Sequence, residues 1–198
     1  MTDTATTDHP HARLHAGDAA RVATFAALIA VLGLPGSISL FGNAVPVTLQ
    51  TLGVMLAGAI LGARRGALAV VTFLALVAAG LPLLAGGRGG LGAFAGPSAG
   101  YLVGFVAGAY VTGLLVERLR RVTFLGVLGA AVVGGIAAVY AVGLPVQALV
   151  TGLPLAQTAA LSAVFLPGDL LKALACAAIT VGVARSYPAA LRHRGREG

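Results

Sequence analysis

The sequence predicts an all-α integral membrane protein, and both its composition and the spacing of its apolar runs indicate that class. Of the 198 residues, 58% are hydrophobic and only 10% are charged, whereas charged residues make up about 25% of a typical soluble domain. The mean hydropathy is +0.96. Apolar runs alternate with short segments that contain Gly, Pro or Arg, as expected for transmembrane helices joined by short connections.

These breaks predict six transmembrane helices. Pro35 follows the first helix, Arg64 and Arg65 separate the second from the third, and Pro82 follows the third. The apolar stretch 143–166 contains two prolines, so we expect a connection there that could hold a short helical segment. The expected helices cover residues 19–34, 48–63, 67–81, 98–115, 124–142 and 167–184.

Basic residues predict how these helices are oriented. They precede the first helix, occupy every second connection and follow the last helix, and basic residues favour the cytoplasmic side of a membrane. We therefore expect both termini in the cytoplasm, with a disordered polar tail over 1–18, a membrane domain over 19–185 and a basic tail over 186–198. The basic residues are Arg13, Arg21, Arg64, Arg65, Arg118, Arg120, Arg121, Arg185, Arg192, Arg194 and Arg196.

The connections predicted on the outer side contain almost no charge. Residues 36–47 and 143–166 have none, and the Gly-rich connection after the third helix has only Arg88. Solvated loops are usually more polar than this. We therefore expect these segments to fold back over the bundle, where they could form a lid over a pocket.

Asp169 and Lys172 are charged residues inside the apolar stretch 123–184. A charge within a membrane helix costs roughly 2.5–3.5 kcal/mol on insertion scales, so such residues tend to pair and to serve a function. Three positions apart on a helix, the two side chains share a face. They are expected in the first turns of the sixth helix, near Arg88. They could form the polar end of a ligand pocket or a structural ion pair between packed helices.

Three further residues are candidates for such a pocket. The Gln50 amide can donate and accept hydrogen bonds to a polar ligand, or it can bond between helices. Arg88 could clamp a carboxylate, or it could face solvent or lipid phosphate. Tyr101 could stack on a ligand ring or anchor its helix at the membrane interface.

No catalytic or metal-binding constellation is visible in the sequence. All four histidines lie in the tails, and Cys176 has no cysteine or histidine at ligand spacing. No phosphate-binding GxxxxGK[ST] pattern occurs. We therefore expect no enzyme activity, cofactor or metal. The net charge of +7 follows from the topology and does not indicate nucleic acid binding.

Small residues recur at four-residue spacing on several helices, which lets neighbouring helices approach closely. For Gly58 and Gly62, and for the stripe that begins at Gly100 and continues at 104 and 108, we expect packing within the bundle. The first helix lies at the edge of the chain, so its small residues could instead dock another protein. These are Ala19, Ala23, Ala27 and Ala30.

Several motifs, taken together and in order, resemble the BioY family, the biotin-specific substrate-binding (S) components of energy-coupling factor (ECF) transporters. The similarity spans about residues 22–184. One departure is Ser98–Ala99, where the family more often has Thr-Gly. The motifs are VPVTLQTLG (45–53), LGARRGA (61–67), GLP (80–82) leading into AGGRGGL (85–91), GPSAGY (96–101) and FLPGDLLK (165–172).

The resemblance implies a six-helix S-component fold in the prokaryotic plasma membrane, with a biotin pocket near the outer face. By motif position it implies ligand contacts from Gln50, Arg88, Tyr101, Asp169 and Lys172. It also implies partners, namely a membrane-embedded T component that docks on the first-helix alanines and ATP-binding cassette ATPases that hydrolyse ATP. A member that works alone could form a homo-oligomer.

Three other functions remain open at this level. The chain could be an S component for another small vitamin, a membrane enzyme acting on lipids, or a purely structural membrane protein. The lipid enzyme is disfavoured because it needs a catalytic cluster at the membrane interface, where no histidine or acid is placed suitably. A structural role predicts that apolar replacement of Asp169 and Lys172 together preserves stability.

Overall fold

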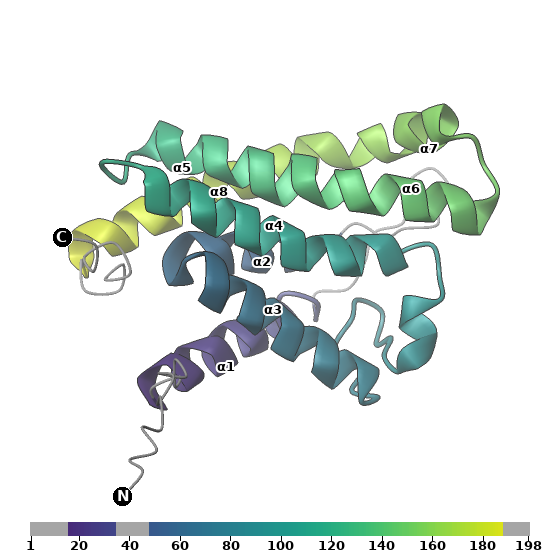
Figure 1. Ribbon diagram of the computed structural model, residues 1–198, viewed down its shortest axis with the longest axis horizontal. Coiled ribbons are helices and arrows are strands. Elements are labelled where there is room, and N and C mark those ends of the chain that lie inside the picture. Colours follow the sequence, from purple (N-terminus) through teal and green to yellow (C-terminus); the bar gives the residue numbers. More distant parts are fainter. Residues whose placement is uncertain (1–15, 35–47, 188–198) are drawn as a thin grey trace, which may run out of the picture.

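The computed structural model describes residues 16–34 and 48–187, and their regular structure is helical apart from one isolated β-bridge between Leu84 and Arg88. The all-α prediction is therefore confirmed for these residues (Figure 1). The α-helices are α1 (Ala16–Val31), α2 (Gln50–Leu61), α3 (Ala63–Ala78), α4 (Ala99–Arg118), α5 (Phe124–Ala131), α6 (Val139–Thr151), α7 (Leu155–Ser162) and α8 (Leu166–Ser186).

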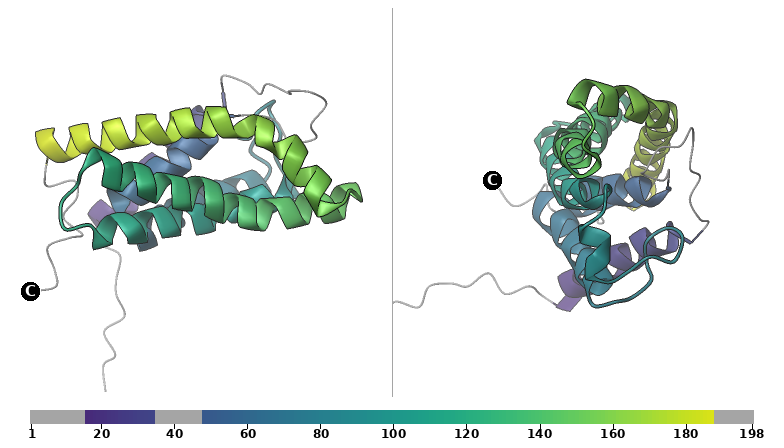
Figure 2. Two further views of the ribbon diagram at one scale, coloured as in Figure 1. Left: turned by 90° about the horizontal axis from the view of Figure 1, so that it is seen from above. Right: turned by 90° about the vertical axis from the view of Figure 1, so that its right-hand side faces the viewer.

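Two short elements join pairs of these helices into longer rods. A π-helix, η2 (Val132–Ala138), connects α5 to α6, and a 3₁₀ turn, η3 (Ala163–Phe165), connects α7 to α8. The resulting rods lie alongside each other and meet at the α7 tip (Figure 2). These two rods and α4 are each long and apolar enough to cross a membrane. The prediction of six membrane crossings remains a prediction.

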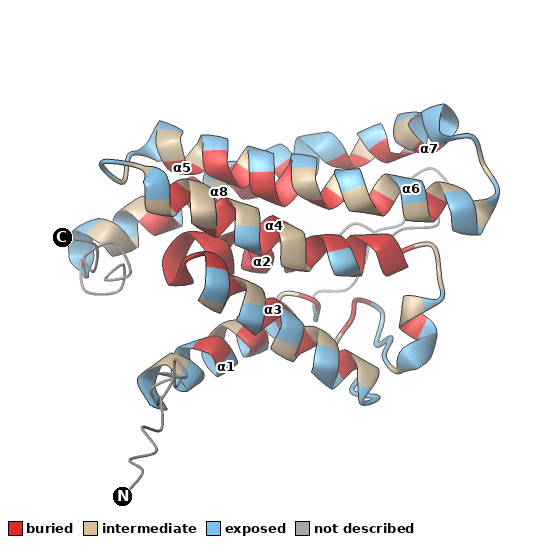
Figure 3. Cartoon of the chain, in the orientation of Figure 1, coloured by how far each residue is buried: buried red, intermediate tan, exposed pale blue. Residues whose placement is uncertain are grey.

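Helix α2 is the centre of the bundle. Ten of its twelve residues are buried, whereas the rods of α5–α6 and α7–α8 expose their outer faces (Figure 3). It contacts α1, α3, α4 and α8. A helix that is apolar on all sides is expected at the centre of a bundle. Polar side chains at the start of α2 therefore lie inside the protein.

The glycine stripe of α4 packs inside the bundle, as predicted. A Cβ atom at Gly104 would lie 2.8 Å from the backbone oxygen of Val139, and one at Gly108 would lie 3.0 Å from that of Gly134. The glycines thus bring the backbone of α4 against η2 and α6, a contact that larger side chains would prevent.

The turn between α2 and α3 is tighter than predicted. Gly62 alone separates the two helices, with φ of +84° and ψ of 178°, a conformation that glycine adopts without a steric penalty. Arg64 and Arg65 therefore lie in the first turn of α3 and not in a loop. On the facing helix, Gly113 leaves room for this turn.

The stretch 143–166 contains helical segments, as the sequence allowed, but far more of it is helical than a connection would be. Helix α6 continues through Pro145 to Thr151, and α7 begins at Leu155, so only residues 152–154 form a loop. The flanking residues are apolar, and a long loop in apolar surroundings would leave backbone groups without hydrogen bonds. Continuing the helix avoids that penalty, although Pro145 itself supplies no N–H.

This continuation changes where Asp169 and Lys172 lie. They occupy the first two turns of α8, but α7 and η3 precede them in a helical run of 32 residues from Leu155 to Ser186. The predicted position in the first turns of that helix is confirmed, and the added turns of α7 and η3 place the pair near the middle of the longer run. A mid-rod position places both charges deep among neighbouring helices.

The connection between α3 and α4 folds back on the bundle, as expected for an outer segment. Its Leu84 and Ala85 are buried, Gly90 donates a backbone hydrogen bond to Val77 of α3, and a 3₁₀ turn, η1, forms over Leu91–Phe94. The other segment expected to form the lid, 36–47, lies outside the described residues.

The predicted tails lie mostly outside the described residues. Residues 16–18 belong to the first turn of α1, and α8 ends at Ser186. The beginning of α1 and the end of α8 lie at the same end of the bundle (Figure 1).

Replacement of Gly113 by alanine should destabilise the fold. A Cβ there would meet the backbone nitrogen of Ala63 and lie 2.5 Å from the carbonyl carbon of Gly62, and these backbone atoms cannot yield as a flexible side chain can. We expect a loss of about 1–3 kcal/mol, measured as a lower midpoint of thermal unfolding in detergent. The control is Gly129→Ala, because a Cβ at Gly129 meets nothing within 4 Å. Equal midpoints for the two variants would contradict the tight packing of α4 on the α2–α3 turn.

Candidate ligand-binding site

Asp169 and Lys172 form a buried ion pair on α8. The Lys172 Nζ lies 2.9 Å from Asp169 Oδ1, and the two side chains are 8% and 7% exposed. Their three-residue spacing places both on one face of the helix, as the sequence predicts. Removing two charges from water is unfavourable unless further hydrogen bonds satisfy the remaining polar atoms.

Hydroxyl groups from two other helices supply those hydrogen bonds. The Tyr140 hydroxyl of α6 donates to Asp169 Oδ2 at 2.7 Å, and Lys172 Nζ donates to the Thr51 hydroxyl of α2 at 3.0 Å. The ion pair therefore joins α2, α6 and α8 at one place in the interior. We call these four residues the charged cluster.

A second polar cluster lies beside the first, between α4, α6 and α7. The Tyr101 hydroxyl donates to Gln147 Oε1 at 2.8 Å, and the Ser162 hydroxyl donates to the same oxygen at 3.3 Å. All three residues are buried. The rings of Tyr101 and Tyr140 meet edge to face, with centroids 5.9 Å apart and planes at 83°, an arrangement that aromatic pairs favour. This ring contact connects the two clusters.

Gln50 lies at the first position of α2 and is 2% exposed. Its side-chain nitrogen donates to the backbone oxygen of Leu83 at 3.0 Å, with a longer contact of 3.4 Å to that of Ile29. The amide thus ties the start of α2 to α1 and to the segment after α3. This is the interhelical bonding that the sequence left open as an alternative. Because Thr51 is the next residue, these hydrogen bonds also fix the part of α2 that carries it.

Arg88 does not join the ion pair, and the expectation that it lies near Asp169 and Lys172 stays a prediction. Its Nε donates to the backbone oxygen of Ala85 at 3.3 Å, and its Nη1 donates to the Ser98 hydroxyl at 3.4 Å. No carboxylate among the described residues forms an ion pair with it. The guanidinium therefore links the α3–α4 connection to the residue that precedes α4.

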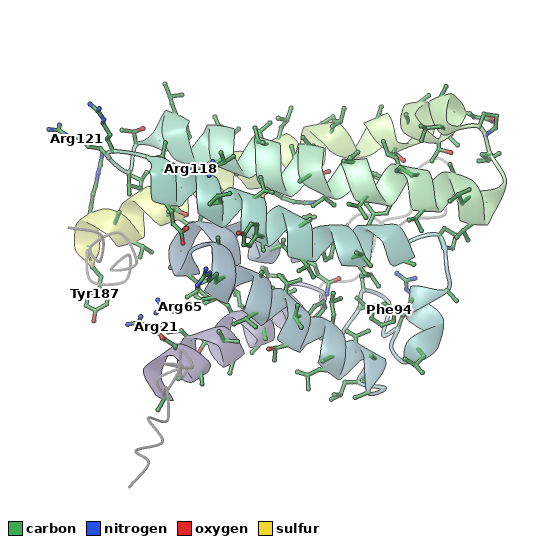
Figure 4. The ribbon with its side chains drawn as sticks, in the orientation of Figure 1. Arg21, Arg65, Phe94, Arg118, Arg121 and Tyr187 are labelled. Carbon is green, nitrogen blue, oxygen red and sulfur yellow. The ribbon has the colours of Figure 1, made fainter. Side chains whose placement is uncertain are left out.

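Most of the other charges gather at the opposite end of the bundle. Asp18 pairs with Arg65 at 2.9 Å and with Arg21 at 3.9 Å. Both arginines lie at the same end as Arg118 and Arg121, whereas Phe94 lies at the other end (Figure 4). This distribution agrees with the sequence analysis, which placed the basic connections on one side.

An apolar hollow of about 520 Å³ opens at the turn between α6 and α7. No residue of the two polar clusters lines this hollow, and its lining side chains are apolar, so none of them can orient a polar ligand by a hydrogen bond. Its lining residues are Pro145, Ala148, Leu149, Gly152, Leu153 and Leu155.

Sequence reasoning missed four residues of the two clusters. Thr51 was passed over although it adjoins Gln50, and Tyr140 was hidden in an apolar run. Gln147 and Ser162 fell in the stretch interpreted as a connection. The signal that could have found Gln147 is its spacing, because it lies seven residues after Tyr140 and so near the same face of one helix.

The charged cluster offers a ligand one anionic acceptor and one cationic donor within a small buried space. Such a pair suits a compact, neutral ligand group that both donates and accepts hydrogen bonds. No group of three or more His, Cys, Asp or Glu side chains that could hold a metal ion occurs in residues 16–34 and 48–187.

The alanine ladder of α1 lies away from both clusters and on the surface. Ala19, Ala23 and Ala27 are exposed, and Ala30 is half-buried. The opposite face of α1, with Ala26 and others, packs into the bundle. The ladder is therefore available to a partner helix.

Comparisons with known proteins agree with these features. Residues 4–189 match the profile of the BioY family. The chain is 50% identical over 190 residues to a biotin transporter BioY of Rhodobacter capsulatus, covering 88% of this chain and 96% of that protein. It is 44% identical over 169 residues to a probable biotin transporter BioY of Bacillus subtilis, covering 85% and 91%.

The fold is also similar to that of a solved protein. The crystal structure of the S-component for biotin from an ECF-type ABC transporter superposes with a TM-score of 0.82 at 31% identity, covering 85% of this chain and 91% of that one. Together, the profile match over nearly the whole sequence and this agreement in fold establish that the chain belongs to the BioY family.

Proposed function

We propose that this chain captures biotin and is the substrate-binding subunit of an ATP-driven importer of the ECF type. The observation that carries the proposal is the buried Asp169–Lys172 pair inside an otherwise apolar bundle, in a chain that is 50% identical to a biotin transporter. Buried charges in a membrane protein commonly mark a substrate pathway. The chain acts as a transport subunit and not as an enzyme.

The polar groups of biotin match the charged cluster. The ureido group has two N–H donors and one carbonyl acceptor, and a carboxylate has about four lone-pair sites. Asp169 uses two of these on Lys172 and Tyr140, so acceptor capacity remains for ureido N–H groups. Lys172 can donate to the ureido carbonyl, since an ammonium has three N–H donors.

The remaining candidate residues complete the proposed pocket. The biotin carboxylate needs a cation or N–H donors, and Arg88 on the folded-back connection can provide them because its described hydrogen bonds go to neutral oxygens. The ring of Tyr101 can pack on the apolar bicyclic ring of biotin. Gln50 would hold the start of α2, and hence Thr51, at the site.

The same proposal covers membrane placement and partners. The helices α1, α2, α3 and α4 and the two rods would each cross the plasma membrane, with both termini in the cytoplasm beside the basic end of the bundle. A T component and ABC-type ATPases would supply ATP hydrolysis, and the exposed ladder of Ala19, Ala23 and Ala27 would dock the T component.

A structural role for the ion pair is the second candidate, and one observation favours it. Both charges already have partners within the protein, because Tyr140 and Thr51 satisfy them from neighbouring rods. A fully satisfied buried pair can hold helices in register without any ligand.

Replacement of either charge should weaken biotin binding. We expect Asp169→Asn and Lys172→Ala each to raise the Kd at least tenfold, about 1.4 kcal/mol, because each removes one charged hydrogen-bonding group from the pocket. The measurement is equilibrium binding of radiolabelled biotin to purified, ligand-stripped protein.

Asp18→Asn is the matched control, since it removes an ion-paired carboxylate at the basic end of the bundle, outside the charged cluster, and should leave the Kd unchanged. Tight binding that neither site variant weakens would assign the pair a structural role. A folded wild-type protein that binds no biotin would refute the proposed function.

A bulky residue on the α1 ladder should abolish transport without affecting capture. Ala23→Trp is expected to leave the Kd for biotin within twofold of wild type, while ATP-dependent uptake in cells that contain the partner subunits falls at least tenfold. The reason is that tryptophan prevents close approach of a second helix. Ala75→Trp, on an exposed face of α3, is the control and should preserve uptake. Uptake by the Ala23 variant at the wild-type rate would exclude this ladder as the docking face.

A further inference from the structure

We propose that Tyr140 is a positioning residue that fixes the orientation of the Asp169 carboxylate for ligand binding, and that the π-helix η2 sets the direction of the Tyr140 side chain. The inference rests on the proposed function, because it concerns how the charged cluster meets biotin. It assigns a role to a residue and to a backbone feature that the sequence did not single out.

The first step is the geometry of the hydrogen bond. The Tyr140 hydroxyl lies 2.7 Å from Asp169 Oδ2, a short distance typical of a hydroxyl that donates to a charged oxygen. The bond joins two rods, since residue 140 belongs to α6 and residue 169 to α8. It therefore fixes the carboxylate relative to a neighbouring helix and not only within its own.

The second step concerns the freedom of the carboxylate. The χ2 torsion of aspartate has a broad, roughly two-fold profile and does not hold the carboxylate plane by itself. Lys172 holds Oδ1 from the same helix at 2.9 Å, and Tyr140 holds Oδ2 from the other side. With both oxygens held, the remaining lone pairs have defined directions, which lowers the entropy lost when a ligand binds.

The third step is what holds Tyr140 itself. Its ring packs against both apolar core clusters of the bundle, and it contacts the Tyr101 ring edge to face. Tyr101 is in turn held by its hydrogen bond to Gln147. A side chain fixed by its neighbours in this way can transmit a fixed position to the group it contacts.

The fourth step is the register of the helix. Along the α5–η2–α6 rod, buried positions recur at steps of three or four residues, and from Ala131 to Gln147 every fourth residue is buried. In an α-helix, a step of four residues advances the face by about 40°. The four such steps from Ala131 to Gln147 would carry the buried face by about 160° around an unbroken α-helix. The buried positions are Val127, Ala130, Ala131, Gly134, Gly135, Ile136, Val139, Gly143 and Gln147.

The π-helix reduces this drift, because its wider turn accommodates an additional residue. Tyr140 lies in the first turn after it. Without the additional residue, its side chain would be rotated by about 100° about the helix axis. Such π-helical turns are rare and frequently occur at functional sites. Here the turn directs a tyrosine hydroxyl toward the buried carboxylate.

The test is biotin binding by Tyr140→Phe, which removes the hydroxyl and keeps the ring. We expect the Kd to rise about tenfold, with the midpoint of thermal unfolding of the ligand-free protein within about 2 °C of wild type. Tyr110→Phe is the matched control, because Tyr110 is 43% exposed on α4 and should bind as wild type does.

A double-mutant cycle distinguishes positioning from direct ligand contact. If Tyr140 acts through the carboxylate, Tyr140→Phe should change the Kd less than twofold in an Asp169→Asn background, measured with labelled biotin up to millimolar concentration. An equal loss in both backgrounds would overturn the inference, as would wild-type affinity of the single variant. Absence of binding by the wild type would instead refute the proposed function.

Deletion of Val133 tests the role of the π-helix. This residue is exposed, and its removal should restore α-helical register and turn Tyr140 away from α8. We expect a folded deletion variant to bind biotin as weakly as Tyr140→Phe does, and adding Tyr140→Phe to it should cause no further loss. Wild-type affinity of the deletion variant would overturn this part of the inference, and the tyrosine variant tests the first part on its own.

Discussion

The buried ion pair between Asp169 and Lys172 is the interaction on which the arrangement of the bundle depends. Inside an apolar protein, each charge needs partners beyond the other charge, because an unsatisfied polar atom there is strongly destabilising. The partners come from α2 and α6 through Thr51 and Tyr140. Helices α2, α6 and α8, which are far apart in the sequence, are therefore constrained to meet at one place. The polar groups that a small ligand requires lie at that same place.

Small residues make that meeting possible. Without a strong hydrophobic driving force between helices in lipid, association depends on close packing. Glycines bring α4 against η2 and α6, and Gly143 leaves room for the Tyr101 ring, which a Cβ there would approach to 2.6 Å. The aromatic contact between Tyr101 and Tyr140 follows from this packing, so the apolar framework and the polar clusters support each other.

The three features on which the proposed function depends lie apart in space. Basic residues gather at one end (Figure 4), the polar clusters are buried in the bundle, and the alanine ladder of α1 lies on its surface. A substrate-binding subunit needs this separation, because its ligand must be enclosed while a partner protein binds its outer surface. The exposed ladder and the buried ion pair share no residue, so each can be altered without the other.

The sequence by itself determined the helical class, the gathering of basic residues at one end, the glycine contacts and the pairing of Asp169 with Lys172, because these depend on composition and short spacing. It did not determine the helix over 143–151, because proline and glycine usually mark the end of a helix. In apolar surroundings, however, the backbone finds hydrogen-bond partners only within a helix, so the helix continues. Nor did the sequence place Tyr140, Gln147 and Ser162 in the site. Only the tertiary structure did so, because a π-helix and close packing between distant segments decide which side chains face one another.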